Sequence, residues 1–133
     1  SVKNVYLEQL YTFSDPKRDP RGRVISVAYM ALVARENVII KAGSDAGEAK
    51  FFPIEKLPKL AFDHKKILSY ATKRLKRKLE YTNVAQYILS KKFTLSQLQN
   101  VYETVFEQKF DVRNFRKKID KLGIVKETGE KER

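Results

Sequence analysis

Short apolar runs alternate with polar, turn-forming stretches over the first sixty residues. Residues 5–13 mix β-branched, aromatic and leucine side chains, and residues 23–34 (RVISVAYMALVA) are almost continuously apolar. The first run predicts a strand, and the second predicts a strand covered on both faces. After an apolar triplet at residues 38–40, another short buried strand is expected at residues 51–54. These patterns predict a sheet of two or three strands, which by itself has exposed edges.

The stretch between the first two predicted strands, residues 14–23 (SDPKRDPRGR), has the composition of a loop. Its two prolines and one glycine disfavour regular structure, and four basic side chains lie within its ten positions. The sequence therefore predicts a constrained, basic loop.

The apolar period changes to about 3.6 residues from Asp63 onward, which is typical of an amphipathic helix. Asp63 is a candidate N-cap. The recurring apolar residues are Ile67, Ala71, Leu75 and Leu79, while lysine and arginine supply the polar side. A second, short helix is expected to begin at Thr82 and to end near Ser90.

Thr94 gives the clearest helix start in the chain, because Thr94 and Gln97 have the spacing of a capping box. An apolar stripe at helical spacing follows and predicts a helix over residues 93–109.

One more helix is predicted from Asp111, a candidate cap, to Leu122, with Gly123 where a left-handed C-terminal residue is favoured. Its expected apolar anchors are Val112, Phe115, Ile119 and Leu122. At 100° per residue, the opposite arc holds Arg113, Asn114, Lys117 and Lys121, flanked by Arg116 and Lys118. The pattern predicts a helix that is anchored on one side and basic on the other.

Composition excludes several classes of site. The 133 residues contain no cysteine and one histidine, so disulfides, thiolate zinc sites and cysteine nucleophiles are excluded. Metal binding through His64 is not expected, and no catalytic residue, resident metal or cofactor is predicted. No apolar run approaches the ~20 residues of a membrane-spanning helix, so we expect no membrane partner. The lack of cysteine fits a cytoplasmic protein, which is the location we expect.

The charge is strongly positive and unevenly distributed. The formal net charge is +12; residues 1–60 hold 10 basic and 7 acidic side chains, against 18 and 9 in residues 61–133. Such a surplus favours a polyanionic partner, met mainly by the second half.

The order of helix, turn, helix and basic helix, followed by a turn at Thr128 and Gly129, matches a winged helix-turn-helix, whose recognition helix enters the DNA major groove. A solvated surface is the alternative explanation of the basic row. On the DNA hypothesis, Arg113, Asn114 and Lys117 are expected to contact base edges. The residues expected at phosphates are Arg116, Lys118, Lys121, Thr94 and Ser96. Lys126 and Lys131 would belong to the wing.

Six strings together resemble one family, the Nudix-related transcriptional regulators of bacteria. They are YLEQLYTF from Tyr6, DPKRDPRGR from Asp15, FFPIEKLP from Phe51, LAFDH from Leu60, FTLSQLQ from Phe93 and RNFRKKI from Arg113. In that family a Nudix domain senses a sugar or a nucleotide such as ADP-ribose, and a C-terminal winged helix binds an operator as a dimer. The resemblance implies a ligand-responsive, homodimeric repressor of transcription whose partners are double-stranded DNA and a small-molecule effector.

The chain departs from the family at the Nudix box, the glycine and glutamate series that holds magnesium beside a pyrophosphate. None of the five glycines is followed by that acidic series. We therefore expect the chain to be a piece of a longer protein, with an α+β fold in which a partial Nudix-like sheet precedes a helical winged helix-turn-helix. The expected parts are a Nudix-like portion at residues 1–62, a connecting helix at 63–80 and a DNA-binding domain at 81–133.

The resemblance also implies a ligand role for the basic loop, which the family places beside its ligand pocket. Arg18, Arg21 and Arg23 are the residues expected to meet a phosphate or a ribose. Pairing of Asp15 and Asp19 with these arginines is the alternative.

Two other functions stay open. The chain could be the C-terminal part of a Nudix hydrolase acting on ADP-ribose or a related nucleoside diphosphate, although its residues supply no Nudix box. An RNA-binding module also suits the charge, but the aromatic residues are scattered rather than displayed together as stacking platforms.

Overall fold

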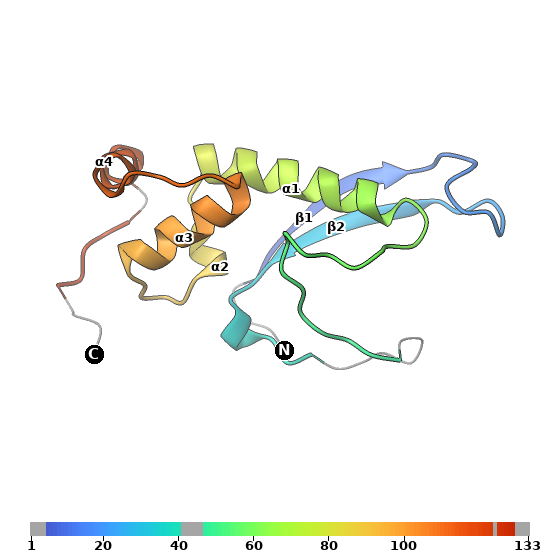
Figure 1. Ribbon diagram of the computed structural model, residues 1–133, viewed down its shortest axis with the longest axis horizontal. Helices are drawn as coiled ribbons and strands as arrows, with labels where there is room; N and C mark the ends of the chain where they lie inside the picture. The colour runs from blue at the N-terminus through green and yellow to red at the C-terminus, as the bar shows by residue number, and fades with distance from the viewer. Residues whose placement is uncertain (1–4, 41–46, 124, 130–133) are drawn as a thin grey trace.

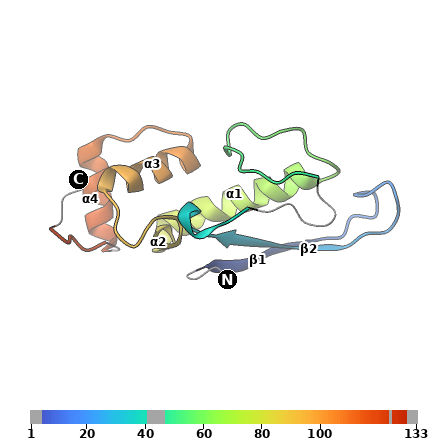
Figure 2. The ribbon, with the colours of Figure 1, turned by 90° about the horizontal axis from the view of Figure 1, so that it is seen from below.

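The computed structural model describes residues 5–40, 47–123 and 125–129. Its elements, in chain order, are β1 (Tyr6–Phe13), β2 (Ser26–Leu32), the 3-10 helix η1 (Arg35–Asn37), α1 (His64–Tyr81), α2 (Ala85–Ile88), α3 (Leu95–Phe106) and α4 (Val112–Leu122). The molecule is elongated, with the strands at one end and α2, α3 and α4 at the other (Figures 1 and 2). Helix α1 lies along the strands and leads from one end to the other.

The strands β1 and β2 form an antiparallel pair that runs from Tyr6 opposite Leu32 to Phe13 opposite Ser26. One face of the pair is buried, through the side chains of Leu10, Phe13, Met30 and Leu32. The other face is exposed and carries Leu7, Val27 and Tyr29. Tyr11 follows an irregularity in the strand register, and its ring stacks on Tyr70 of α1. The expectation that the second strand is covered on both faces is therefore wrong for the described residues, because α1 packs on one face only.

Residues 51–54 are not a strand. Phe51 and Phe52 are half exposed, and each ring has a cation above it, Arg35 at 5.0 Å from the Phe51 centroid and Lys50 at 5.4 Å from the Phe52 centroid. The prediction of a buried strand is wrong here, since Pro53 has no amide hydrogen to donate and its carbonyl instead closes a turn with the amide of Lys56.

Helix α1 begins after Asp63, as predicted, but the Asp63 side chain does not cap it. The inner side of the helix is fixed to β1 by charge as well as by apolar packing. Arg74 Nη1 lies 3.0 Å and Lys78 Nζ 3.5 Å from Glu8 Oε1, and Arg74 also donates to the Leu10 carbonyl. These contacts hold the helix against the strand pair.

The buried core of the strand pair continues into the helical end. Leu79, Leu98, Tyr102 and Ile119, from three different helices, are fully buried. The Tyr102 hydroxyl donates to the Leu79 carbonyl at 2.7 Å, and burial raises the pKa of this phenol. The core therefore connects the C-terminal end of α1 with α3 and α4.

Within the described ranges, no helix combines the length and the apolar character that crossing a membrane would need.

Candidate nucleic-acid interface

Helix α4 is delimited at both ends by local hydrogen bonds. The Asp111 carboxylate accepts from the amide of Asn114 at 3.0 Å, as the sequence predicts. At the other end Gly123 takes a left-handed conformation, with φ 64°, and its amide donates to the carbonyls of Ile119 and Asp120. A glycine is suited to this position because it lacks the Cβ that would strain such a backbone. The two caps fix which residues of the helix face which way.

The inner side of α4 is held by two buried residues rather than four. Phe115 and Ile119 are buried, and the Phe115 ring meets the Tyr102 ring edge-on with centroids 5.3 Å apart. Leu122 is half buried and packs against the same core. The prediction that Val112 is a fourth anchor is wrong, since its side chain is 69% exposed. Val112 is the first helical residue, beyond the part of α4 that packs against α3.

The outer side of α4 carries every polar residue that the helical pattern placed there. Arg113, Asn114, Arg116, Lys117, Lys118 and Lys121 are all exposed. None of the five cations among them forms an ion pair with another described residue. Lys118 lies nearest to α3, with its ammonium 5.9 Å from the ring centroids of both Tyr102 and Phe106. The helix thus presents an uncompensated positive surface that an anionic partner would stabilise.

The other residues predicted to contact DNA lie outside α4. Thr94 caps α3, where its hydroxyl oxygen accepts from the amide of Gln97 at 3.1 Å while the Gln97 side chain accepts from the Thr94 amide. Ser96 is exposed in the first turn of the same helix, and Lys126 is exposed beyond Gly123. Residues 125–129 have no assigned strand, and Lys131, expected in the wing, is outside the described residues.

Arg18, at the far end of the molecule, holds the basic loop to the start of α1. Its Nε and Nη2 each lie 2.8 Å from an oxygen of Asp63, and Nη1 donates to Ser26 at 2.7 Å. The side chain is only 6% exposed, and its hydrogen bonds hold the pKa of Asp63 below its usual value. Sequence reasoning missed this pair, since the two residues are 45 positions apart and Asp63 also has the local pattern of a cap.

Arg21 and Arg23, the two other arginines of the loop, remain at the surface. Arg21 pairs with buried Asp19 at 2.7 Å and lies over the Phe62 ring at 4.7 Å from its centroid. Arg23 is exposed. A cavity of about 170 Å³ lies beside them, lined by Arg18, Asp19, Arg21, Val24, Ser26, Phe62 and His64. The structure brings Arg18 and Arg21 to one cavity, and the ligand role of the three arginines stays a prediction.

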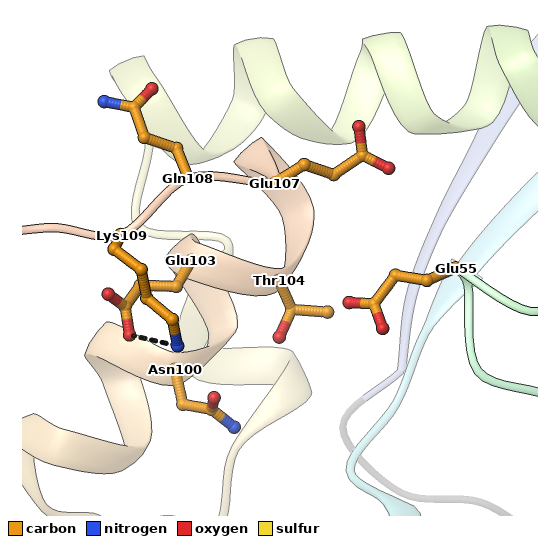
Figure 3. A pocket seen from close by; sticks show the side chains of 7 residues that line it. All are labelled: Glu55, Asn100, Glu103, Thr104, Glu107, Gln108 and Lys109. Carbon is orange, nitrogen blue, oxygen red and sulfur yellow. Dashed lines mark ion pairs between the residues drawn. The ribbon is translucent and has the colours of Figure 1, made fainter.

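A polar cavity of about 420 Å³ lies between the C-terminal end of α3 and the loop that carries Glu55 (Figure 3). Glu103 stands beside it with both oxygens engaged, one 3.7 Å from Lys109 Nζ and the other accepting from the amide of Phe110. The other residues that line the cavity are Glu55, Asn100, Thr104, Glu107, Gln108 and Lys109. No pattern in the sequence pointed to this cavity. Neither here nor elsewhere among the described residues do three or more histidine, aspartate or glutamate side chains form a group that could hold a metal ion.

The capped, basic helix at the end of a helical bundle is a feature of winged helix DNA-binding domains, and comparison with known proteins supports that class. Residues 85–133 match the family model of the NrtR DNA-binding winged helix domain. The whole chain resembles NrtR proteins as well, which confirms the resemblance to the Nudix-related transcriptional regulators and the predicted α+β fold class.

Two relatives of known sequence support this assignment. The chain is 33% identical to the ADPR responsive transcriptional repressor NtrR of Acinetobacter baylyi over 132 residues, which are 96% of this chain and 51% of that protein. It is also 52% identical to an ADP-ribose pyrophosphatase of Methanocaldococcus jannaschii over 59 residues, 44% of this chain and 34% of that protein. The chain therefore spans about half, or less, of the relatives it matches.

Three solved structures each match 86% or more of the chain. NrtR of Shewanella oneidensis matches with a TM-score of 0.77 and 33% identity, over 96% of this chain and 60% of that one. The same protein complexed with a 27mer DNA matches with a TM-score of 0.76 and 30% identity, over 96% and 59%. A MutT/nudix family protein from Enterococcus faecalis matches with a TM-score of 0.68 and 29% identity, over 86% and 54%.

Proposed function

We propose that this chain is part of a ligand-responsive transcriptional regulator that binds double-stranded DNA through α4. The observation that carries the proposal is the helix itself, anchored by Phe115 and Ile119 and exposing five cations and one asparagine. It lies in the segment that matches the NrtR DNA-binding domain, and a solved relative is complexed with DNA. The alternative explanation, a merely solvated helix face, does not account for the family match and the DNA-bound relative.

The five cations and the asparagine of α4 each have a proposed part in DNA binding. Arg113, Asn114 and Lys117 contact base edges, since arginine pairs with guanine and asparagine with adenine through two hydrogen bonds each. The residues proposed to contact phosphates are Arg116, Lys118, Lys121, Thr94 and Ser96. Lys126 is proposed to contact DNA from the wing.

We propose ADP-ribose as the effector and repression as the direction of control. The names of two relatives support this choice, an ADPR responsive repressor and an ADP-ribose pyrophosphatase. In this chain the arginine loop, with Arg21 and Arg23 at the surface, is the proposed contribution to the effector site at residues 1–62. We propose a cytoplasmic location, because such a regulator must be in the compartment that holds its DNA.

The proposed regulator acts as a homodimer. Two recognition helices related by a two-fold axis would meet half-sites one or two helical turns apart. Effector binding would favour the state in which the two helices no longer match that spacing. Sedimentation of the protein with and without operator DNA tests the dimer directly.

The test of DNA binding is a mobility shift with the upstream region of the protein's own gene, with and without ADP-ribose. We expect binding that weakens with salt, with a slope of log K against log salt near −5 if about six phosphates are neutralised. Arg113→Ala/Lys117→Ala should abolish the preference for this region over scrambled DNA. The matched control Lys56→Ala/Lys59→Ala removes two charges from an exposed loop and should keep it. A flat salt response, or equal effects of both variants, would contradict the proposal.

A hydrolase is the second candidate, favoured by the 52% identity with the ADP-ribose pyrophosphatase. Incubation of the full-length protein with ADP-ribose and Mg²⁺, followed by chromatography of the nucleotides, separates the two functions. Release of AMP without any DNA binding would favour the hydrolase over the regulator.

A further inference from the structure

Helix α1 carries a second set of exposed cations that neither the core nor α4 uses. At 100° per residue, five cations lie within an arc of about 120° on its outer side. They are Lys65, Lys66, Lys73, Lys76 and Arg77. All are exposed except Lys76, which is half buried, and none forms an ion pair with another described residue.

The inner side of the same helix is different, because its cations are compensated. Arg74 and Lys78 face β1 and share the carboxylate of Glu8. On the outer arc the acidic side chain is Glu80, in the last turn. The positive charge of α1 is therefore concentrated on the side that the fold leaves open.

The outer sides of α1 and α4 face the same edge of the molecule. Tyr102 of α3 contacts both helices, through its hydroxyl bonded to the carbonyl of Leu79 at 2.7 Å and its ring 5.3 Å from that of Phe115. Figure 1 shows α3 below both α1 and α4. Helix α1 packs on the strand pair and α4 packs on α3. Figure 1 shows these supporting elements below the two helices, so the exposed sides of α1 and α4 both point away from them. One long polyanion can reach both surfaces.

We propose that the row Lys66, Lys73 and Arg77 on α1 binds backbone phosphates of DNA beside the segment held by α4. This inference rests on the proposed function and extends its contact surface. The row spans about 17 Å at 1.5 Å per residue, which corresponds to about five base pairs of duplex at 3.4 Å each. Flexible lysine and arginine side chains on a helix surface suit phosphates, so the contact is independent of base sequence.

The experiment measures DNA affinity of the full-length protein as a function of salt, for wild type and for Lys66→Gln/Lys73→Gln/Arg77→Gln. Each lost phosphate contact should lower the salt slope by about 0.9, so the triple variant loses about 2.7 per chain. The ratio of wild-type to variant affinity should therefore be roughly 40-fold smaller at 200 mM salt than at 50 mM salt. The loss should be equal on the gene's upstream region and on scrambled DNA. A hydroxyl-radical footprint should keep its centre and lose flanking protection.

Two control variants make the result specific to α1. Lys17→Gln/Lys56→Gln/Lys59→Gln also removes three positive charges, but from exposed loops, and should keep the wild-type salt slope. Lys66→Arg/Lys73→Arg keeps the charges and should also bind as wild type. The single variant Lys73→Gln, at an exposed site, should lower the slope by about 0.9 even if the triple variant is poorly folded.

Other outcomes distinguish the two proposals. An unchanged slope and footprint in the α1 variants, or an equal loss in the loop control, overturns the α1 contact while leaving α4 as the DNA-binding helix. Absence of salt-dependent binding by the wild type overturns the proposed function itself.

Discussion

Asp19 shows how a single buried carboxylate orders a loop of otherwise exposed residues. It is 5% exposed, and its oxygens accept from both the amide and the guanidinium of Arg21. The hydrogen bond from the Arg21 side chain, then that from its backbone, lowers the pKa of Asp19 from 3.8 to about 2. Because the folded state favours the ionised form, this group stabilises the fold above its unfolded pKa.

The expected pH dependence follows from that shift. The stabilising contribution of Asp19 is complete above about pH 4 and is lost as the pH falls toward about 2. Asp19→Asn should therefore lower the melting temperature at pH 7 and show a shallower further loss between pH 4 and pH 2 than wild type. Asp120→Asn, at an exposed site on α4, should follow the wild-type profile. Parallel profiles of Asp19→Asn and wild type in thermal unfolding would contradict this assignment.

At the scale of elements, the helices with local caps could be predicted and the features set by distant residues could not. The Thr94 capping box and the Asp111 and Gly123 caps are formed by neighbours in sequence, so the starts of α3 and α4 and the end of α4 agree with the sequence. Residues 51–54 have the apolar character of a strand, but forming one depends on a partner strand, which local sequence does not specify. The exposure of one face of β2 likewise depends on which elements pack against the strand pair, and local sequence does not specify this.

The same distinction applies to the candidate interface. Helical period alone places the outer residues of α4, and all six are exposed as expected. The exposure of Val112 and the bond between Arg18 and Asp63 depend on tertiary packing, so periodicity could not supply them.

Different positions on α4 should have different effects on sequence preference. Arg113→Ala should weaken binding by about 1–3 kcal/mol and relax the preference at one base position, since it would remove the proposed contact to a base edge. Lys121→Ala should weaken cognate and scrambled DNA alike, because a phosphate contact carries no sequence information. Binding of both variants to a set of singly substituted operators measures the difference. Identical losses across that set for both variants would count against these roles.

At the scale of the whole molecule, Tyr102 connects the helices that must keep a fixed geometry. It is fully buried between α1 and α4, and its hydroxyl satisfies the Leu79 carbonyl near the end of α1. A buried carbonyl that loses a hydrogen-bond donor is costly, because no water replaces the bond.

Tyr102→Phe should therefore lower the free energy of unfolding by about 1–3 kcal/mol, measured by urea denaturation. Tyr29→Phe is the matched control, since Tyr29 is 59% exposed, and we expect a change within about 0.5 kcal/mol. Equal stability of the two variants would show that the bond to Leu79 does not stabilise the helical end.

The ion pair between Arg18 and Asp63 connects the arginine loop directly to the start of α1. The helix has 18 residues, which makes it a rod of about 27 Å at 1.5 Å per residue. Its far end is joined to α4 through Tyr102. For a rod of this length, a tilt of about 10° at one end displaces the other end by roughly 5 Å. A displacement of that size exceeds the reach of a hydrogen bond, so any rearrangement that tilted α1 together with the strand pair would break contacts at the other end of the molecule.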